Sequence, residues 1–390
     1  MRICFVTTLP GMLPLLTNAA TRESGGGIQV QTTLFADALA ARGHEVCFVV
    51  AEPLEGGQAS PSTPHSRFRF VQAYDRNAGG PLRGVRRLHG LWRALRRADS
   101  DVYVLPGAGA LAAVIAHFCT RLRRRFVFWA ASATDPVCHI PGPSRIARGK
   151  RGLARYGISR AHLIIAQTEE QRRAFRDSMA RDAAVIPNVW PLPEKRDTER
   201  FAARTGLPSR FVLWVSNLRP EKRPEWVLDI ATELADIPFV VVGGPVPGYE
   251  RLYEELRARA RAMRNVTFSG LVPFDETPGY FGAAELLLNT SAVEGYPNTF
   301  LQAWAAGKPV VASFDPDEVI CRFGLGRHAE SRADLAAAVA ALWQDAALRR
   351  TMGDAGYAYL QEYHSAERVV SLLEAELTKL LGSPAPANEN

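Results

Sequence analysis

Charged and polar side chains in two segments of the chain are suited to hold a phosphorylated ligand. Arg219, Lys222 and Arg223 lie between an apolar run and an amphipathic one. Cations in such a loop can bind a diphosphate and stabilise it as it leaves, although solvated loop charges are the alternative interpretation. Glu294 lies in a loop that contains Gly and Pro, and Gln302 follows eight residues later on the helix that this loop opens. The backbone amides of residues 295–299 and the N-terminus of that helix face the same side as the cations, so the two segments together predict an anion-binding site.

A glycine-rich stretch near the N-terminus has a similar potential. Gly25, Gly26 and Gly27 come directly before an amphipathic segment. Glycine lets the backbone approach a ligand closely, and a helix N-terminus offers N–H groups that suit phosphate. The stretch lacks the G-x-G-x-x-G pattern of dinucleotide-binding loops, so a merely flexible loop is the alternative.

The apolar pattern around these residues predicts alternating strands and helices. Residues 2–9 are typical of a buried strand, 32–44 of an amphipathic helix and 45–51 of the next strand, which together form a parallel crossover unit. The same alternation begins again at residue 210, after a stretch rich in Pro and charge near 188–200. The predicted fold class is therefore α/β, with two Rossmann-like, doubly wound parallel-sheet domains and a ligand-binding cleft between them.

The linker gives the domain boundaries. We expect an N-terminal domain over residues 1–190 and a C-terminal domain over 191–382, whose last helix is free to pack back on the first domain. The polar, Pro-rich residues 383–390 are expected to be disordered. No apolar run approaches the ~20 residues that cross a bilayer, and the start of the chain lacks the pattern of a signal peptide, so we expect a cytoplasmic protein.

The charge is unevenly distributed along the chain. Residues 1–190 carry 26 Lys and Arg against 13 Asp and Glu, whereas 191–390 carry 21 against 27. Within the basic half, residues 82–97 alternate apolar and Arg positions at helical spacing. This pattern suits an anionic membrane surface, with a solvated helix face as the alternative. No nucleic-acid-binding motif accompanies the charge, so no nucleic acid partner is expected.

Taken in order, these segments resemble the retaining glycosyltransferases of family 4, which have the two-domain GT-B fold. The resemblance covers nearly the whole chain and is most specific in EGYPNTFLQAWAAGKPVVAS, residues 294–313. It implies that Lys222 grips the diphosphate of a nucleotide-sugar donor and that Glu294 lies against the donor sugar. Two positions depart from the family pattern: Asn217 replaces an arginine, for which Arg219 is a candidate substitute, and Gln302 replaces the glutamate that binds the ribose.

The resemblance also implies roles for other residues. Gly25 and Gly26 match the glycines near the phosphates and the acceptor, and the backbone of Leu271 and Val272 is expected beside the base. The full set of expected donor-binding residues is Gly25, Gly26, Arg219, Lys222, Leu271, Val272, Gly295, Asn298, Thr299 and Gln302. On the acceptor side the segment 130–142 offers Asp135, which completes the expected catalytic set with Glu294 and Lys222. A loop Asx turn or helix cap is the alternative for Asp135.

Neither a metal nor a cofactor is expected. Asp315 and Asp317 form a D-x-D sequence, a pattern that can bind a metal. They follow a strand, however, in a family that generally works without a metal. The five cysteines are far apart and form no C-x-x-C pair, so their spacing predicts neither a disulfide framework nor a zinc site.

The resemblance implies sugar transfer with retention, from a nucleotide-diphosphate sugar to the hydroxyl of a glycan, a lipid-linked acceptor or a small molecule. Assembly of a cell-surface polysaccharide or glycolipid is the expected setting, with peripheral attachment to the inner face of the membrane as an option. A nucleotide-sugar epimerase and a non-catalytic partner protein of the same fold are the alternatives.

Overall fold

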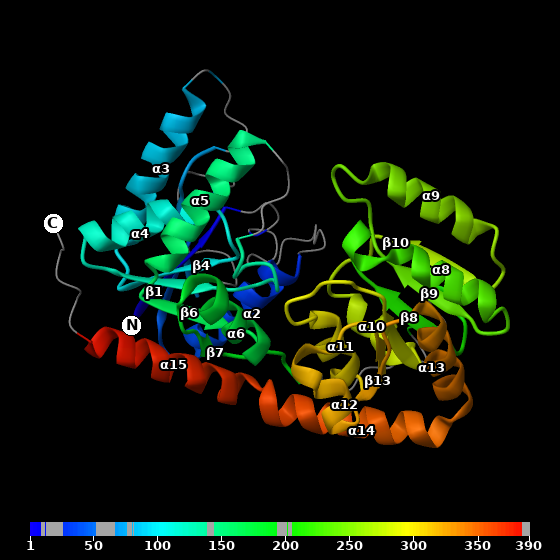
Figure 1. Ribbon diagram of the computed structural model, residues 1–390. Coiled ribbons are helices and arrows are strands. Elements are labelled where there is room, and N and C mark those ends of the chain that lie inside the picture. Colours follow the sequence, from blue (N-terminus) through cyan, green and yellow to red (C-terminus); the bar gives the residue numbers. More distant parts are fainter. Residues whose placement is uncertain are drawn as a thin grey trace. The chain divides into compact units, whose positions relative to one another are not determined.

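A computed structural model describes residues 1–8, 12, 26–51, 67–75, 80, 82–138, 144–192, 201 and 205–383. The chain divides into two compact units (Figure 1). The first comprises Met1–Val189 together with Ala366–Asn390, and the second comprises Trp190–Ser365. The predicted tail 383–390 lies outside the described residues except for Ser383.

The first unit is built on a seven-stranded, fully parallel sheet. Its strand order is β3-β2-β1-β4-β5-β6-β7. The strands are β1 (Arg2–Thr7), β2 (Glu45–Val50), β3 (Phe68–Gln72), β4 (Val102–Pro106), β5 (Arg125–Trp129), β6 (Leu163–Ala166) and β7 (Ala184–Val185). Nearly every residue of β1, β2, β4 and β5 is buried, as expected for a sheet covered on both faces.

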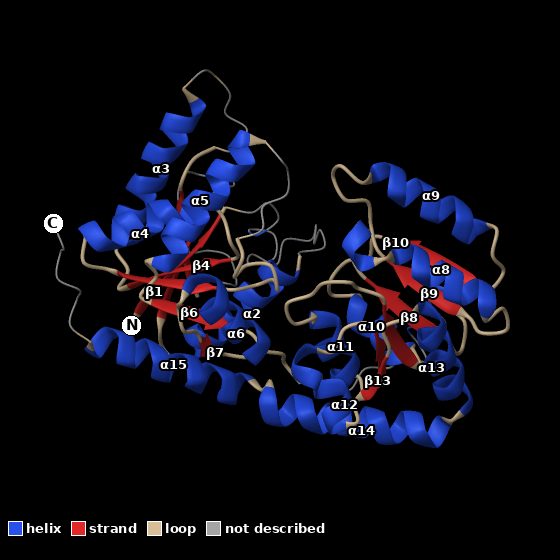
Figure 2. Ribbon diagram, in the orientation of Figure 1, coloured by secondary structure: helices blue, strands red, loops and turns tan. Residues whose placement is uncertain are grey.

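Helices cover both faces of this sheet (Figure 2). They are α2 (Gly27–Ala41), α3 (Arg83–Ala98), α4 (Leu111–Arg121), α5 (Arg145–Ser159), α6 (Glu169–Met179) and α15 (Ala366–Gly382). Cys4 and Val6 of β1 face the layer formed by α3, α4, α5 and α6, whereas Ile3 and Phe5 face the layer formed by α2 and α15. This is the two-residue alternation of a strand, which divides the apolar side chains between two cores.

The last helix, α15, belongs to the first unit although the second unit precedes it in sequence. Val369, Val370, Leu373 and Leu377 are buried in the same core as the side chains of α2. The predicted second domain, 191–382, therefore differs from the second unit by this helix. The prediction allowed the last helix to pack on the first domain, and it does so.

An ionic contact joins α15 to the end of α2. Glu374 accepts hydrogen bonds from Arg42 Nη1 at 2.6 Å and from His44 Nε2 at 2.7 Å. Burial alone would raise the pKa of the Glu374 carboxyl, but these bonds to the charged form outweigh burial and lower its pKa below the ordinary value of 4.5.

The second unit contains a six-stranded, fully parallel sheet in the order β10-β9-β8-β11-β12-β13. The strands are β8 (Val212–Val215), β9 (Phe239–Val242), β10 (Val266–Gly270), β11 (Leu286–Asn289), β12 (Val310–Ala312) and β13 (Gly326–His328). The α-helices are α8 (Pro224–Glu233), α9 (Glu250–Arg261), α10 (Thr277–Ala283), α11 (Asn298–Ala305), α12 (Val319–Phe323), α13 (Arg332–Gln344) and α14 (Ala346–Tyr363). Two short 3-10 turns, η1 (Pro220–Lys222) and η2 (Pro316–Glu318), precede α8 and α12.

The core of the second unit lies between the sheet and the helices α8, α9 and α13. Trp214 of β8 is its largest side chain, and it packs with apolar residues of α8 and α13. On the opposite side Trp304 of α11 contacts Tyr359 of α14, with ring centroids 5.4 Å apart. The prediction of two doubly wound parallel sheets is confirmed, and the strands β3 and β13 are additions that the sequence pattern did not indicate.

The contact of Glu374 leads to a stability prediction. We expect Glu374→Gln to lower the free energy of unfolding of the first unit by about 1 kcal/mol at neutral pH. Because the pKa of Glu374 is lowered in the folded state, its contribution is present above about pH 4.5 and is lost as the pH falls through the folded-state pKa. Urea unfolding at several pH values measures this difference.

The matched control is Glu376→Gln on the same helix, where the carboxylate pairs with the exposed Lys379. This variant should unfold like the wild type at every pH. Equal losses at both positions would mean that the general charge of α15, and not its contact with Arg42 and His44, stabilises the helix.

Candidate functional site

Lys222 and Glu294 meet at the carboxyl edge of the second sheet. Lys222 lies in the loop after β8, Glu294 lies in the loop after β11, and β8 and β11 are hydrogen-bonded neighbours. The Lys222 Nζ is 2.5 Å from Glu294 Oε1, and the two side chains are 19% and 14% exposed. An ion pair that is partly shielded from water is stronger than a surface pair, and it still leaves the ammonium group within reach of a ligand. The two residues for which the resemblance implies the closest donor contacts thus form one site.

The hydroxyl of Thr290 holds the Lys222 loop in place. Its Oγ1 is 2.7 Å from the carbonyl oxygen of Lys222 and 3.0 Å from that of Arg223, and it accepts a hydrogen bond from Trp214 Nε1 at 3.0 Å. Thr290 is fully buried. The backbone N–H of Ala292 adds a bond to the carbonyl oxygen of Glu221 at 2.8 Å. The loops after β8 and β11 are therefore fastened to each other at two points.

Arg219 and Arg223 have different surroundings. Arg219 is about half exposed, and its guanidinium lies 3.8 Å from the carboxylate of Glu221. Arg223 has a left-handed backbone, with φ 45°, directly before Pro224 at the first turn of α8, and its guanidinium lies over the ring of Trp226, 4.4 Å from the centroid. Arg219 is thus the more available of these two cations for an anionic ligand.

The loop after Glu294 leads into α11. Pro297 precedes this helix, no side chain of the described residues caps it, and its first turn carries no acidic residue. Gly295 is buried, whereas Asn298 and Thr299 are half-buried in the first turn. The N-terminal end of a helix with this composition attracts anions through its N–H groups and its dipole. Gln302 lies on the next turn and is 8% exposed.

Tyr296 holds the loop between β11 and α11 through a buried side-chain contact. Its side chain is buried, and its hydroxyl is 3.1 Å from Nε2 of His364, which is also buried. Burial raises the pKa of the Tyr296 phenol well above its ordinary value, so the hydroxyl stays protonated. The carbonyl oxygen of His364 in turn accepts a hydrogen bond from the N–H of Trp190.

Leu271 and Val272 follow β10 at the same edge of the sheet. Val272 is buried, whereas Leu271 is about half exposed and lies against Gly244. A Cβ atom at Gly244 would come within 2.9 Å of the Leu271 side chain, and one at Gly243 would come within 2.3 Å of the carbonyl oxygen of Ser216. The two glycines therefore allow the segments after β8, β9 and β10 to approach closely.

Asp135 of the first unit is buried and binds three backbone N–H groups. Its Oδ1 accepts from Ala108 at 3.1 Å, and its Oδ2 accepts from Ala131 at 2.6 Å and from Ser132 at 3.0 Å. Burial raises the pKa of this carboxyl, and the three hydrogen bonds offset part of that effect. The carboxylate ties the loop after β4 to the loop after β5, and because its donors are Ala108 and residues three and four positions earlier, the contacts are neither an Asx turn nor a helix cap.

The other predicted residues of the first unit are less fully described. Gly26 precedes α2 in extended backbone, with φ −66°, and its carbonyl oxygen accepts a bond from Val30 N–H at 3.2 Å. Gly25 lies outside the described residues. The structure therefore brings Lys222 and Glu294 into contact, whereas the acceptor-side residues stay predictions.

No sequence pattern described above indicates a role for Thr290, Trp214, Tyr296 or His364. They support the site by hydrogen bonds that connect positions 68 to 76 residues apart. A polar residue at the end of an apolar run, such as Thr290 after β11, is the signal that could have identified one of them.

Two family models match the chain. That of the glycosyl transferases group 1 matches residues 209–345, and that of Glycosyltransferase Family 4 matches residues 25–190. Together they take in more than three quarters of the sequence and fall on the two units separately.

Curated relatives match a shorter part of the chain. A D-inositol 3-phosphate glycosyltransferase of Mycobacterium tuberculosis strain H37Rv is 32% identical over 170 residues, which is 40% of this chain and 35% of that protein. Its counterpart in Mycobacterium bovis has the same identity and coverage. The match therefore spans about a third of the length of these relatives.

Solved structures match over almost the whole chain. A sucrose-phosphate synthase from Thermosynechococcus elongatus has a TM-score of 0.76 at 19% identity and covers 98% of this chain and 99% of its own. The Anabaena protein HepE in complex with UDP-glucose has a TM-score of 0.74 at 17% identity and covers 97% of this chain and 100% of its own. At these identities the similarity concerns the fold, two parallel-sheet α/β domains of the GT-B type.

The contacts of Thr290 lead to a testable prediction. We expect Thr290→Val, which preserves the shape of the side chain, to lower the free energy of unfolding of the second unit by about 1 to 3 kcal/mol. The reason is that Trp214 Nε1–H and the carbonyl oxygen of Lys222 lose a buried partner. Denaturant unfolding measures the loss, and Thr290→Ser, which retains the hydroxyl, should recover most of it. Equal stability of the Val and Ser variants would contradict this role for the hydroxyl.

Proposed function

The chain belongs to glycosyltransferase family 4, and from this premise we propose that it transfers a sugar from a nucleotide-diphosphate sugar to a hydroxyl acceptor with retention at the anomeric carbon. The observation that carries the proposal is the contact between Lys222 Nζ and Glu294 Oε1, because it joins a cation suited to a diphosphate with a carboxylate suited to sugar hydroxyls. The complex of HepE with UDP-glucose supports a donor of this class. In this proposal Glu294 keeps Lys222 neutralised until the donor arrives.

Lys222 has the main electrostatic role in the proposed reaction. When the bond between the sugar and the diphosphate breaks, negative charge accumulates on the leaving phosphate oxygens. The ammonium of Lys222, the guanidinium of Arg219 and the N-terminal end of α11 stabilise this charge, and an interaction that strengthens in the transition state accelerates the step. Thr290 contributes by fixing the backbone of Lys222 before the donor binds.

The proposed reaction needs no dedicated protein base. The leaving diphosphate oxygen takes the proton of the acceptor hydroxyl on the face from which it departs, so the acceptor replaces it with retained configuration. Glu294 accepts hydrogen bonds from hydroxyls of the transferring sugar, and Gln302 contacts the ribose through its amide, which both donates and accepts. Asp135 positions the loops after β4 and β5, on which we place the acceptor.

We further propose that the first unit attaches to an anionic membrane surface. Three exposed apolar side chains, Leu82, Val85 and Leu88, lie at the start of α3, and Ile146, Leu153 and Tyr156 are exposed on α5. Both helices are rich in Arg and pack on the same face of the sheet as α4. No helix of the described residues has the length and apolarity to cross a bilayer. The proposed acceptor is then a lipid-linked glycan precursor at the inner face of the membrane.

The structure corrects one part of the helical pattern behind this proposal. Leu95 is fully buried, and Trp92 packs on Phe118 with ring centroids 5.1 Å apart, so these two residues belong to the core and not to an exposed stripe. Arg87 lies over the ring of Tyr74, 5.6 Å from its centroid. The apolar surface available to lipid is therefore the first part of α3 together with the exposed face of α5, and the exposed Arg86, Arg93 and Arg96 supply positive charge along α3.

Donor turnover by the Lys222 and Glu294 variants tests the proposed activity. We expect Lys222→Ala to lower turnover by about 10² to 10³, the typical effect of one transition-state donor. Glu294→Gln should lower turnover far more than Gln302→Ala, because Glu294 is placed against the transferring sugar. The measurement is release of nucleoside diphosphate and transfer of labelled sugar over a panel of donors and acceptors, with circular dichroism to check folding.

The outcomes separate the alternatives. An epimerase would convert the donor without an acceptor and keep the nucleotide attached, whereas a non-catalytic protein would leave every donor unchanged even after extended incubation. If Lys222→Ala retains turnover within threefold of the wild type, the proposed role of Lys222 in stabilising the leaving diphosphate is contradicted.

Liposome sedimentation tests the membrane proposal. Binding should require anionic lipid and weaken at high salt, since each Lys or Arg near such a surface contributes about 1 kcal/mol and the attraction is screened over roughly 8 Å. Changing Arg86, Arg93 and Arg96 of α3 to Ser should reduce binding. The matched control changes Arg251, Arg257 and Arg261 of α9 in the second unit and should bind like the wild type. If the wild-type protein does not bind anionic liposomes at low salt, the proposal is contradicted and a small soluble acceptor is favoured.

A further inference from the structure

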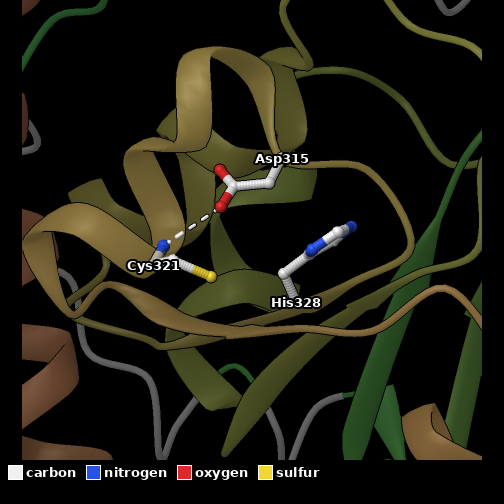
Figure 3. A group of neighbouring side chains, drawn as sticks. All are labelled: Asp315, Cys321 and His328. Carbon is white, nitrogen blue, oxygen red and sulfur yellow. Dashed lines mark hydrogen bonds between the residues drawn. The ribbon is translucent and has the colours of Figure 1, made fainter.

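Three side chains with metal-binding atoms converge beside the last two strands of the second sheet (Figure 3). Asp315 follows β12, Cys321 lies on α12, and His328 is the last residue of β13. A carboxylate oxygen, the thiol sulfur and one imidazole nitrogen all lie within 4.8 Å of one another. We propose that these residues form a zinc site.

The chemistry of the three donors selects the ion. Sulfur and imidazole nitrogen are preferred by Zn²⁺, whereas Mg²⁺ and Ca²⁺ take oxygen ligands. In a tetrahedral zinc site, with bonds of about 2.0 to 2.3 Å, neighbouring ligand atoms are about 3.3 to 3.7 Å apart. In the structure the three donor atoms lie within 4.8 Å of one another, so zinc binding requires them to move closer together by side-chain rotation. Cys321 is exposed, which leaves the fourth position open to water.

The backbone holds the carboxylate of Asp315 in place. Its Oδ1 accepts the N–H of Ile320 at 2.8 Å, and its Oδ2 accepts the N–H of Cys321 at 3.1 Å. Each oxygen keeps a second lone pair for an ion. Such hydrogen bonds to a ligand orient it before the metal arrives, and they often account for 10- to 100-fold in metal affinity.

The local fold brings the other two ligands to Asp315. Asp317 and Glu318 have left-handed backbones, with φ 51° and 58°, and this turn returns the chain so that Cys321 faces Asp315. His328 is paired with Ala312 in the register of β12 and β13. Gly326 makes this pairing possible, because a Cβ there would lie 1.8 Å from the carbonyl oxygen of Val310. The site therefore depends on two neighbouring parallel strands and the turn between them.

This site is separate from the proposed sugar transfer. It is built on β12 and β13, whereas Lys222 and Glu294 follow β8 and β11. Its donors also differ from the all-oxygen D-x-D pattern, in which Asp315 and Asp317 would act together. Zinc bound here would fasten the segment 313–328 without neutralising the leaving diphosphate.

Cobalt substitution tests the site in the full-length protein. After treatment with EDTA and dialysis, Co²⁺ should bind in a one-to-one ratio and give a thiolate-to-metal charge-transfer band that Zn²⁺ displaces. The other four cysteines are buried, so Cys321 is the expected source of the band. Cys321→Ser should abolish the band, and His328→Ala and Asp315→Asn should weaken Co²⁺ binding by more than about 100-fold, since loss of a direct ligand exceeds the loss of a group that only orients a ligand.

Two matched controls address ligand identity. Asp317→Asn removes the neighbouring carboxylate, and His89→Ala removes an exposed histidine of α3; both should bind Co²⁺ like the wild type. Absence of a saturable band, or equal loss in the Asp315 and Asp317 variants, would overturn the assignment. Because metal binding is measured without donor or acceptor, its failure is distinguishable from failure of the transferase proposal. EDTA should leave sugar transfer nearly unchanged.

Discussion

The direction of the strands is the constraint on which the chemistry of the second unit depends. In a parallel sheet every strand ends at the same edge, so loops far apart in sequence emerge side by side. Because β8 and β11 are neighbours, Lys222 and Glu294 meet although 72 residues separate them. The cluster of Asp315, Cys321 and His328 arises at the same edge from the next two strands.

The buried hydroxyl of Thr290 fixes the loop after β8 relative to the loop after β11. Strand order alone places two loops near each other but leaves their side chains free to move. Thr290 removes much of this freedom, because it binds the backbone of Lys222 and accepts a bond from the buried ring of Trp214. The cation is therefore held by the core of the unit, and its position does not rely on its ion pair alone.

Much of the fold could be predicted from sequence, because apolar runs such as 2–9 and 45–51 are long and regular. The short β13, Gly326–His328, carries no such pattern, and only its pairing with β12 defines it. The contact of Lys222 with Glu294 also requires strand order, which periodicity does not contain. Asp135 illustrates a further limit: its residue type suits acceptor binding, an Asx turn or a helix cap, and only the structure shows that it joins two loops through three backbone N–H groups. Likewise, helical spacing could not separate the exposed Leu88 from the buried Leu95.

The place of α15 has a consequence for synthesis on the ribosome. The first unit gains Val369, Val370, Leu373 and Leu377 from a helix that is translated after the whole second unit. Until then the nascent chain exposes the apolar side chains of α2 that this helix covers, and exposed apolar surface favours aggregation or chaperone binding. The N-terminal unit begins to form first yet is completed last, so vectorial folding cannot finish the two units one after the other.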